Sequence, residues 1–325
     1  MESEIFAQRT DLSRLNQAVD QIKAAIGKIV VGQHEVIELL IAGILADGHV
    51  LIEGVPGVAK TLTAKLIAKA VNAGFSRIQF TPDLMPSDVI GTSVFNPQTT
   101  AFEFKQGPIF GNIILVDEIN RAPAKTQSAL FEVMEERQVT VDGHTYAMHE
   151  PFLVLATQNP VEHEGTYRLP EAQLDRFIFK IEVKYPSLQE EIEILHNQHQ
   201  QKTADQLKEV EPVLQGEDIV SLRRQVRSLH VEQRLLEFVA KIVYETRNNK
   251  SLYLGGSPRA SLAMINSAKA FAAMNGRDFV TPEDIIRVAA PVLRHRVMLT
   301  PDKEMDGVTA DDVIAQIIQK IEIPR

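Results

Sequence analysis

Residues 49–61 of the chain read HVLIEGVPGVAKT, and this stretch decides the fold. It opens with an apolar run of strand type, His49–Ile52, passes at Gly54 into a tight loop, and enters a helix near Thr61. A strand, a tight loop and a helix N-terminus in this order are the setting in which the pattern G-x-x-x-x-G-K-[ST] holds phosphate. Loop N–H groups and the helix dipole both favour an anion there. The sequence therefore predicts a phosphate-binding loop at Gly54–Thr61.

Lys60 and Thr61 supply the chemistry of this loop. The ammonium group of Lys60 places a charge beside the β- and γ-phosphates, and the hydroxyl of Thr61 offers an oxygen ligand to Mg²⁺. Ala59 stands where the pattern has its second glycine. Alanine keeps the small volume but loses easy access to positive φ, so we expect a backbone there that an L-residue tolerates. Taken alone, the imperfect motif also fits a turn without function.

Two adjacent carboxylates, Asp117 and Glu118, follow the apolar strand predicted at Ile113–Val116. Such a strand ends in two charges when they face a cation or a water molecule that must be activated. We expect Asp117 to hold Mg²⁺ through water and Glu118 to polarise the attacking water. Asn159 follows another apolar run, Phe152–Thr157, and can orient the same water. The alternatives are that Asp117 caps a turn and that Asn159, which precedes a proline, only makes one.

Short apolar runs alternate with helical segments in the first half of the chain. Helices are expected at Thr61–Ala73 and Pro123–Arg137. Strands are expected at His49–Ile52, Arg77–Phe80, Asn112–Val116, Phe152–Thr157 and Phe177–Val183. Strands that alternate with helices predict an α/β fold, here a five-stranded parallel sheet covered by helices on both faces.

Two hairpins are predicted in addition to this sheet. Residues Val139–Met148 alternate around Asp142-Gly143, the strongest short signal for a two-residue hairpin turn. This hairpin should project from the end of the helix at Pro123–Arg137. The second hairpin, Val89–Phe104, should turn at residues 96–100. Neither hairpin is needed to close the sheet, and decorated loops are the alternative.

The regions on either side of this core are predicted to be helical. Leu12–Gly27 has apolar residues at helical spacing, and a second helix ends near Asp47. No strand is expected after residue 186, and Ser257 followed by Pro258 marks a helix start. We predict an αβα nucleotide-binding domain over residues 1–186, a linker helix over 187–205 and an all-α lid domain over 206–325.

The composition limits the class of protein. The 325 residues are 44% hydrophobic, enough for a substantial core, and the formal net charge of −9 gives no global attraction to nucleic acid or anionic lipid. The absence of cysteine rules out disulfides and thiolate chemistry. Residues 1–15 lack the apolar core of a signal peptide, and no apolar run is long enough to span a membrane. We expect a cytoplasmic protein.

Two arginines require a negatively charged partner. Arg176 lies immediately before the apolar strand at Phe177–Val183. Arg259 lies in the first turn of the helix that starts at Ser257, where a cation opposes the helix dipole. A bound triphosphate would balance either charge, and an ordinary salt bridge is the alternative.

Together these motifs resemble the AAA+ ATPases and, within them, the MoxR family of the helix-2-insert clade. The resemblance runs from about residue 15 to 300, nearly the whole chain, and alanine at position 59 is itself typical of the family. The segments that carry it are GVPGVAKT at 54–61, VDEINRAP at 116–123, KTQSAL at 125–130, ATQNP at 156–160, LPEAQLDRF at 169–177 and GSPRA at 256–260.

The resemblance implies ATP and Mg²⁺ as cofactors and a role for each motif. Asp117 and Glu118 would be the Walker B carboxylates, and Asn159 would be sensor 1. Arg176 would be the arginine finger that reaches the neighbouring subunit's ATP, and Arg259 would be sensor 2 in the lid. The adenine pocket would include the segment at 29–33. The residues expected to bind the nucleotide are Val31, Gly32, Gly54, Val55, Pro56, Gly57, Val58, Ala59, Lys60, Thr61 and Leu62.

The resemblance also implies partners. Members of the family form rings, usually hexamers, and are described as chaperone-like ATPases that assemble or activate client proteins, often ones with von Willebrand factor A domains. The two hairpins would be the helix-2 insert and the pre-sensor-1 insert, which tend to face the pore of the ring. Arg168 stands where the family has proline, and no role is assigned to it.

Three other functions share parts of this signature. A nucleic-acid motor needs cations along the path of the strand, but residues 138–149 contain no Lys or Arg, so no nucleic-acid partner is expected. A motor subunit of a metal chelatase shares the inserted hairpins and differs in its dedicated partner. A small-molecule kinase would need an acceptor pocket, for which the sequence offers no signal.

Overall fold

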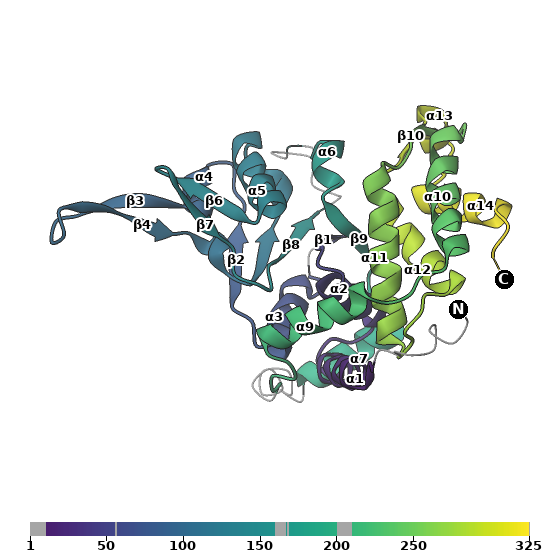
Figure 1. Cartoon of the computed structure of the whole chain (residues 1–325), viewed down its shortest axis with the longest axis horizontal. Helices are drawn as coiled ribbons and strands as arrows, with labels where there is room; N and C mark the ends of the chain where they lie inside the picture. Colours follow the sequence, from purple (N-terminus) through teal and green to yellow (C-terminus); the bar gives the residue numbers. More distant parts are fainter. Residues whose placement is uncertain (1–10, 56, 160–166, 168, 200–209, 325) are drawn as a thin grey trace, which may run out of the picture.

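The computed structural model of the chain describes residues 11–55, 57–159, 167, 169–199 and 210–324. Five parallel strands form the central sheet in the order β2-β5-β8-β1-β9 (Figure 1). The strands are β1 His49–Gly54, β2 Phe75–Gln79, β5 Ile113–Asp117, β8 Leu153–Gln158 and β9 Phe177–Val183. The predicted five-stranded parallel sheet is confirmed. The predicted bounds of β2 were wrong: it starts at Phe75 rather than Arg77, because Phe75 pairs with Ile113 of β5.

Helices cover both faces of the sheet, as predicted. Successive side chains of a strand point to opposite faces, so Ile113 and Leu115 belong to one buried cluster while Ile114 and Val116 belong to another. The helices over the first face are α1 Ser13–Gly27, α2 His34–Leu45 and α3 Lys60–Ala70, and the helix over the second face is α5 Ala124–Glu136. This layering leaves the polar ends of the strands at the rim of the sheet.

Both predicted hairpins are present and project from the sheet on the same side (Figure 1). The hairpins are β3 Gly91–Asn96 with β4 Ala101–Gln106, and β6 Gln138–Val141 with β7 His144–Ala147. The first begins at Gly91 rather than Val89 because the short helix α4, Pro86–Ile90, precedes it. Gly91 has φ 110°, and a Cβ there would lie 2.2 Å from the carbonyl oxygen of Lys105. The hairpins contact each other through Phe104 and Tyr146, whose ring centroids lie 4.6 Å apart.

The C-terminal part is mostly helical, but the prediction that it lacks strands is wrong. Its helices are α7 Leu188–His199, α9 Gly216–Arg227, α10 Gln233–Asn248, α11 Pro258–Met274, α12 Pro282–Leu293, α13 Pro301–Met305 and α14 Ala310–Lys320. An antiparallel pair joins β10, Leu252–Leu254, to β11, Met298–Leu299. Strands this short contain too few residues for an alternating pattern to be recognised. The remaining short elements are η1 Pro108–Phe110, η2 Ile119–Arg121 and α6 Glu171–Leu174.

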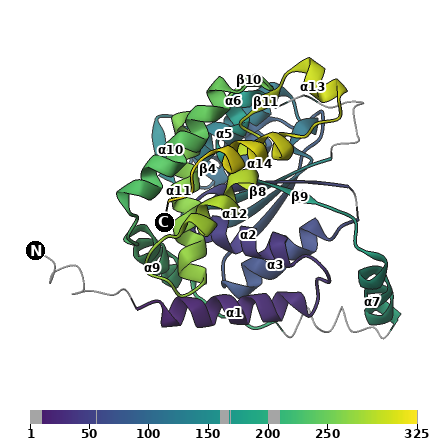
Figure 2. The same ribbon diagram turned by 90° about the vertical axis from the view of Figure 1, so that its right-hand side faces the viewer.

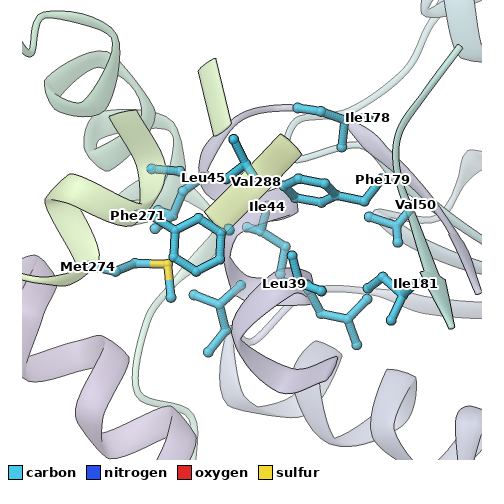
Figure 3. Close-up of a cluster of buried hydrophobic side chains, with 14 of the residues drawn as sticks. Leu39, Ile44, Leu45, Val50, Ile178, Phe179, Ile181, Phe271, Met274 and Val288 are labelled. Carbon is cyan, nitrogen blue, oxygen red and sulfur yellow. The ribbon is translucent and has the colours of Figure 1, made fainter. Parts of the chain in front are cut away.

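Helices α11 and α12 share one buried core with the sheet domain. Figure 3 shows Phe271 and Met274 of α11 and Val288 of α12 gathered with Ile44 of α2 and Phe179 of β9. Each buried side chain of this size stabilises the packing by about 1.5–3 kcal/mol relative to exposure. Helices α11 and α12 are therefore held firmly against α2 and β9. Among the helices of the described ranges, none is both long and apolar enough to cross a membrane.

Candidate active site

The loop between β1 and α3 has the backbone that a phosphate site requires. Gly57 has φ 88°, and a Cβ there would meet no atom within 4 Å, which leaves open space over the loop. Ala59, which caps α3, has φ 56° and ψ 20°. The expectation of a backbone that an L-residue adopts easily was therefore wrong: Ala59 takes the left-handed conformation that glycine would take, at a cost of about 1 kcal/mol. Pro56 lies outside the described residues.

Lys60 and Thr61 occupy the first turn of α3. The Nζ of Lys60 donates to the carbonyl oxygen of Gly54 at 2.5 Å, so the side chain folds back over the mouth of the loop. The hydroxyl of Thr63, one turn further on, donates to the carbonyl oxygen of Ala59 at 3.0 Å and fixes the start of the helix. The chain thus places the ammonium group of Lys60 beside the expected phosphates, with Thr61 next to it in the first turn of the helix.

A cavity of about 420 Å³ opens beside this loop. It is a suitable size for a nucleotide base and sugar. The predicted adenine-pocket residues Val31 and Gly32 line it together with Gly57–Ala59 and Leu62. The Nε2 of Gln33 donates to the carbonyl oxygen of Val58 at 2.7 Å and ties the two segments together. Helix α7 forms a further wall through Glu190, Ile194, Asn197 and Gln198, which sequence reasoning did not identify.

Asp117 and Glu118 lie at the carboxyl end of β5. The buried Asp117 accepts from the Oγ1 of Thr157 at 3.1 Å, and its Oδ2 lies 2.6 Å from the Nε of Arg77. Carboxylate and hydroxyl oxygens are the donors that Mg²⁺ prefers, so Asp117 and Thr61 suit that ion. Glu118 has φ 57°, and its N–H donates to Thr157 at 3.0 Å. This left-handed backbone turns the Glu118 side chain away from the line of the strand.

Strand β2 supplies two polar partners that sequence reasoning missed. Arg77 pairs with Asp117, and the Nε2 of Gln79 donates to the Oε2 of Glu118 at 2.8 Å. The Nε of Arg121 lies 3.0 Å from the same Glu118 oxygen. Arg77 and Gln79 alternate with the buried Ile78, so they share one face of the strand. Both residues lie inside the predicted strand, and this polar alternation indicates that they share a face but not which partners they contact.

Asn159 is buried immediately after β8. Because β8 lies between β1 and β5, Asn159 lies between the strand that leads into the phosphate loop and the strand that ends in the two carboxylates. Neighbouring strands are about 4.8 Å apart, which leaves roughly 10 Å between the ends of β1 and β5. A terminal phosphate and its attacking water above the end of β8 would therefore lie between the phosphate loop and Glu118. Arg168 lies outside the described residues.

Arg176 and Arg259 lie near the amino ends of the parallel strands, whereas the phosphate loop lies at their carboxyl ends. These two rims of the sheet are called the arginine edge and the phosphate edge. Strand β9 runs parallel to β1, with His49 paired to Phe177 and Gly54 paired to Val183. Arg176 precedes Phe177, so a whole strand length separates it from the loop, roughly 20 Å at about 3.3 Å per residue. The structure brings the other predicted site residues that it describes to one edge and does not bring these two arginines there.

The two arginines contact one carboxylate, Glu135 near the end of α5. The Nη2 of Arg259 lies 2.6 Å from Glu135 Oε1, and the Nε of Arg176 lies 3.8 Å from Glu135 Oε2. Arg176 also donates to the carbonyl oxygen of Phe131. The hydroxyl of Ser257 donates to Asp175 at 2.9 Å. In this structure Glu135 is thus the anionic partner that both arginines were expected to need.

Comparisons with known proteins identify the family of the chain. A family model described as "ATPase family associated with various cellular activities (AAA)" matches residues 49–179, and one described as "AAA lid domain" matches residues 244–317. The Bacillus subtilis protein YeaC is 47% identical over 310 residues, 95% of either chain. Chaperone MoxR1 of Mycobacterium tuberculosis is 45% identical over 324 residues, covering 97% of this chain and 84% of that protein.

A solved structure extends the likeness to three dimensions. A protein from Cytophaga hutchinsonii, named for an expected ATPase activity, has a crystal structure that matches with a TM-score of 0.87 and 41% sequence identity. The match covers 97% of this chain and 96% of that one. Because relatives this similar match along nearly the whole chain, the protein belongs to the MoxR family of AAA+ ATPases and is a nucleotide-binding ATP hydrolase.

Proposed function

We propose that the chain is one subunit of a ring, a hexamer as is usual for its family, in which Mg²⁺-dependent ATP hydrolysis drives chaperone-like remodelling or assembly of client proteins. The observation that carries the proposal is the division of the site between two edges of one sheet. Lys60 and Glu118 belong to one edge, and Arg176 and Arg259 belong to the other. Cations at the far edge cannot reach the phosphates of their own chain, so a second copy must supply them.

The phosphate edge binds and neutralises the nucleotide. Lys60 balances the charge of the β- and γ-phosphates. Thr61 and Asp117 are the residues that would hold Mg²⁺, which when bound offsets negative charge on the triphosphate and in the transition state. Asp117 already faces one cation in this structure, the guanidinium of Arg77.

Glu118 is the group that polarises the attacking water, and Asn159 orients that water. In this structure Gln79 and Arg121 both contact Glu118 Oε2. Both contacts are made by one carboxylate oxygen and orient the group, and the other oxygen, Oε1, is the one that would receive a water proton. A change at β2 or at the end of β5 that moves Gln79 would control the rate of hydrolysis.

The arginine edge acts on the neighbouring copy. Arg176 is the arginine finger, and Arg259 lies beside it on the lid, so both reach the neighbour's ATP. An arginine finger supplied by a second subunit raises the rate of ATP hydrolysis about 10³–10⁵-fold. An isolated subunit should therefore hydrolyse ATP slowly, and assembly should switch hydrolysis on.

The hairpins are the proposed contact surface for a client protein, including clients with a von Willebrand factor A domain. Phe95 and Phe102 pair across β3 and β4 with ring centroids 5.4 Å apart, and both are exposed. The β6–β7 hairpin carries no Lys or Arg, which does not suit a nucleic-acid strand. We place this activity in the cytoplasm.

The proposal is tested by complementation between two inactive variants. Lys60→Ala keeps the arginine edge intact, and Arg176→Ala keeps the phosphate edge intact. Each alone should lose about 10³ in kcat. A mixture of the two variants should regain part of the activity. At some interfaces the intact phosphate loop of an Arg176→Ala copy then meets the intact Arg176 of a Lys60→Ala copy. A mixture that co-assembles and stays inactive, or an Arg176→Ala ring with wild-type kcat, would show that hydrolysis is not shared between copies.

Glu118→Gln tests the client part of the proposal. This variant should bind ATP and stall with its client attached, because hydrolysis fails while the nucleotide-bound state persists. Proteins retained by Glu118→Gln are compared with those retained by Lys60→Ala, which should not bind ATP. Identical sets of proteins from the two variants would contradict an ATP-dependent client interaction.

A further inference from the structure

We propose that neighbouring copies join through two apolar surfaces at the two ends of this divided site. The first, the α7 stripe, consists of Leu188, Ile192 and Leu195. The second, the lid patch, consists of Tyr253, Leu254 and Leu262. The α7 stripe of one copy packs against the lid patch of the next. This inference rests on the proposed shared hydrolysis and identifies the surfaces that would bring its two halves together.

The α7 stripe has no cover within the described part of the chain. None of the twelve residues of α7 is buried there, and Leu188, Ile192 and Leu195 are 78%, 50% and 64% exposed. Their spacing places them on one side of the helix. Figure 2 shows α7 standing apart from the sheet and from the other helices. Apolar groups gathered on a protruding helix are typical of a protein–protein contact.

The opposite side of α7 forms a wall of the nucleotide cavity. Glu190, Ile194 and Asn197 line that cavity. They fall on the side of the helix away from the stripe, since successive residues turn by about 100°. A partner bound to the stripe would therefore press α7 against the nucleotide. The stripe is thus placed where a neighbouring copy must arrive to complete the site.

The lid patch flanks Arg259, the cation that the same neighbour would deliver. Leu262 is 66% exposed and lies one turn after Arg259, on the same side of α11. Tyr253 and Leu254 are 78% and 41% exposed in β10, the strand that leads into this helix. Docking of the lid patch would therefore carry Arg259 toward the neighbour's phosphates.

The charges of the two surfaces are complementary. Helix α7 has no Lys or Arg, and of its three glutamates Glu191 flanks the stripe, while Glu190 and Glu193 lie on the other side of the helix. Residues 244–262, which include the lid patch, contain Arg247 and Lys250 against one carboxylate, Glu245, and in addition Arg259, which is paired with Glu135. Opposite charges around an apolar centre favour this pairing and disfavour α7 against α7 or lid against lid.

A second copy fits the stripe better than another occupant because one chain carries both surfaces. They accompany the two halves of the site, the stripe on the nucleotide side and the patch on the arginine side. A contact between different surfaces of identical copies is heterologous, and such contacts generate closed rings when the rotation closes. The geometry therefore points to a head-to-tail contact that completes the ATP site.

The test uses two double variants that keep the net charge unchanged. The α7 variant is Leu188→Gln with Leu195→Gln, and the lid variant is Tyr253→Gln with Leu262→Gln. All four positions are exposed, so both variants should fold, which circular dichroism checks. Each variant alone should sediment as smaller species than the wild type. Its kcat should fall at least about tenfold, because loss of the arginine finger alone lowers the rate of hydrolysis by more than that. Met305→Gln, at a position that is 88% exposed on α13, is the control and should leave assembly and kcat unchanged.

Mixing the two variants distinguishes the proposed contact from its alternatives. A copy with an intact lid patch can still dock on a copy with an intact α7 stripe, so the mixture should form pairs and regain activity. Wild-type assembly and kcat in the α7 variant would show that the stripe is covered by another part of the chain or by a client, and would overturn the proposal. So would a mixture that stays dissociated and inactive.

The complementation of Lys60→Ala with Arg176→Ala separates this proposal from the shared hydrolysis beneath it. If that pair regains activity and the α7 and lid variants do not, hydrolysis is shared but these surfaces are the wrong ones. If neither mixture regains activity, the shared hydrolysis itself is wrong.

Discussion

The carboxylate of Glu135 lies 2.6 Å from the guanidinium of Arg259, so an ion pair joins α5 to the first turn of α11. The other oxygen of Glu135 lies 3.8 Å from the Nε of Arg176. One carboxylate therefore holds together the two cations that the proposed mechanism presents to a neighbouring copy. Because all three side chains are partly exposed, the pair contributes little to stability, and its main effect is on where the cations point.

Glu135→Gln should lower the ATPase rate without unfolding the protein. The free energy of unfolding should change by less than about 1 kcal/mol, because the ion pair is solvent-exposed. We expect kcat to fall roughly tenfold, since misplaced catalytic groups are costly, and KM for ATP to stay constant, since the nucleotide binds at the other edge. Steady-state kinetics measure kcat and KM, with wild type and variant compared at the same degree of assembly. Glu132→Gln, exposed on the same helix, is the control, and an equal loss there would contradict a specific role for Glu135.

Arg77→Met should destabilise the nucleotide-free protein and enlarge its stabilisation by Mg²⁺-ADP. Asp117 is buried, and removal of the guanidinium leaves its charge poorly compensated. We expect a loss of about 1 kcal/mol, a small value because Arg77 is half-exposed. The difference in melting temperature with and without Mg²⁺-ADP should grow by about 2 °C. Arg77→Lys keeps the charge and is the control. An unchanged difference in Arg77→Met would argue against Asp117 as the Mg²⁺ residue.

Gly32→Ala should weaken ATP binding. Gly32 has φ 76°, and a Cβ there would lie 2.4 Å from a Glu190 side-chain oxygen at the wall of the cavity. The left-handed backbone alone costs alanine about 1 kcal/mol. We expect Kd for ATP to rise several-fold, as isothermal titration calorimetry can measure. Gly143→Ala is a matched control, because Gly143 has φ 77° with nothing within 4 Å of a Cβ. Equal affinities in the two variants would remove Gly32 from the binding site.

His49 should make the protein less stable in mild acid. Burial is the main cause that lowers its pKa from 6.5 to about 4, and its Nδ1 accepts the Val154 N–H at 3.0 Å. Between pH 6.5 and 4 the unfolded chain binds a proton that the folded chain refuses. The contribution to stability is therefore complete above the unfolded pKa and is lost as pH falls, by about 1.4 kcal/mol per unit. Denaturation between about pH 7.5 and 5 measures this, and His49→Asn should reduce the slope by about one proton. An unchanged slope would mean that His49 is protonated in the folded protein.

Much of the site could be predicted because its groups belong to local motifs. Lys60 and Glu118 follow apolar strands within short segments whose pattern is visible in the chain. Arg77 and Glu135 could not be found in this way, because their partners Asp117 and Arg259 are 40 and 124 residues distant. Such pairs depend on which strands become neighbours and on where each helix ends.

By itself, the sequence determined the phosphate loop, the parallel five-stranded sheet and the two hairpins, since each follows from side-chain periodicity and turn chemistry over a few residues. Only the tertiary structure decided that Arg176 and Arg259 lie far from that loop. The reason is the direction of β9: it runs parallel to β1, so the residue before its first position lies at the edge opposite the end of β1. Residues 49–61 thus form one half of a site whose other half lies a strand length away in the same chain.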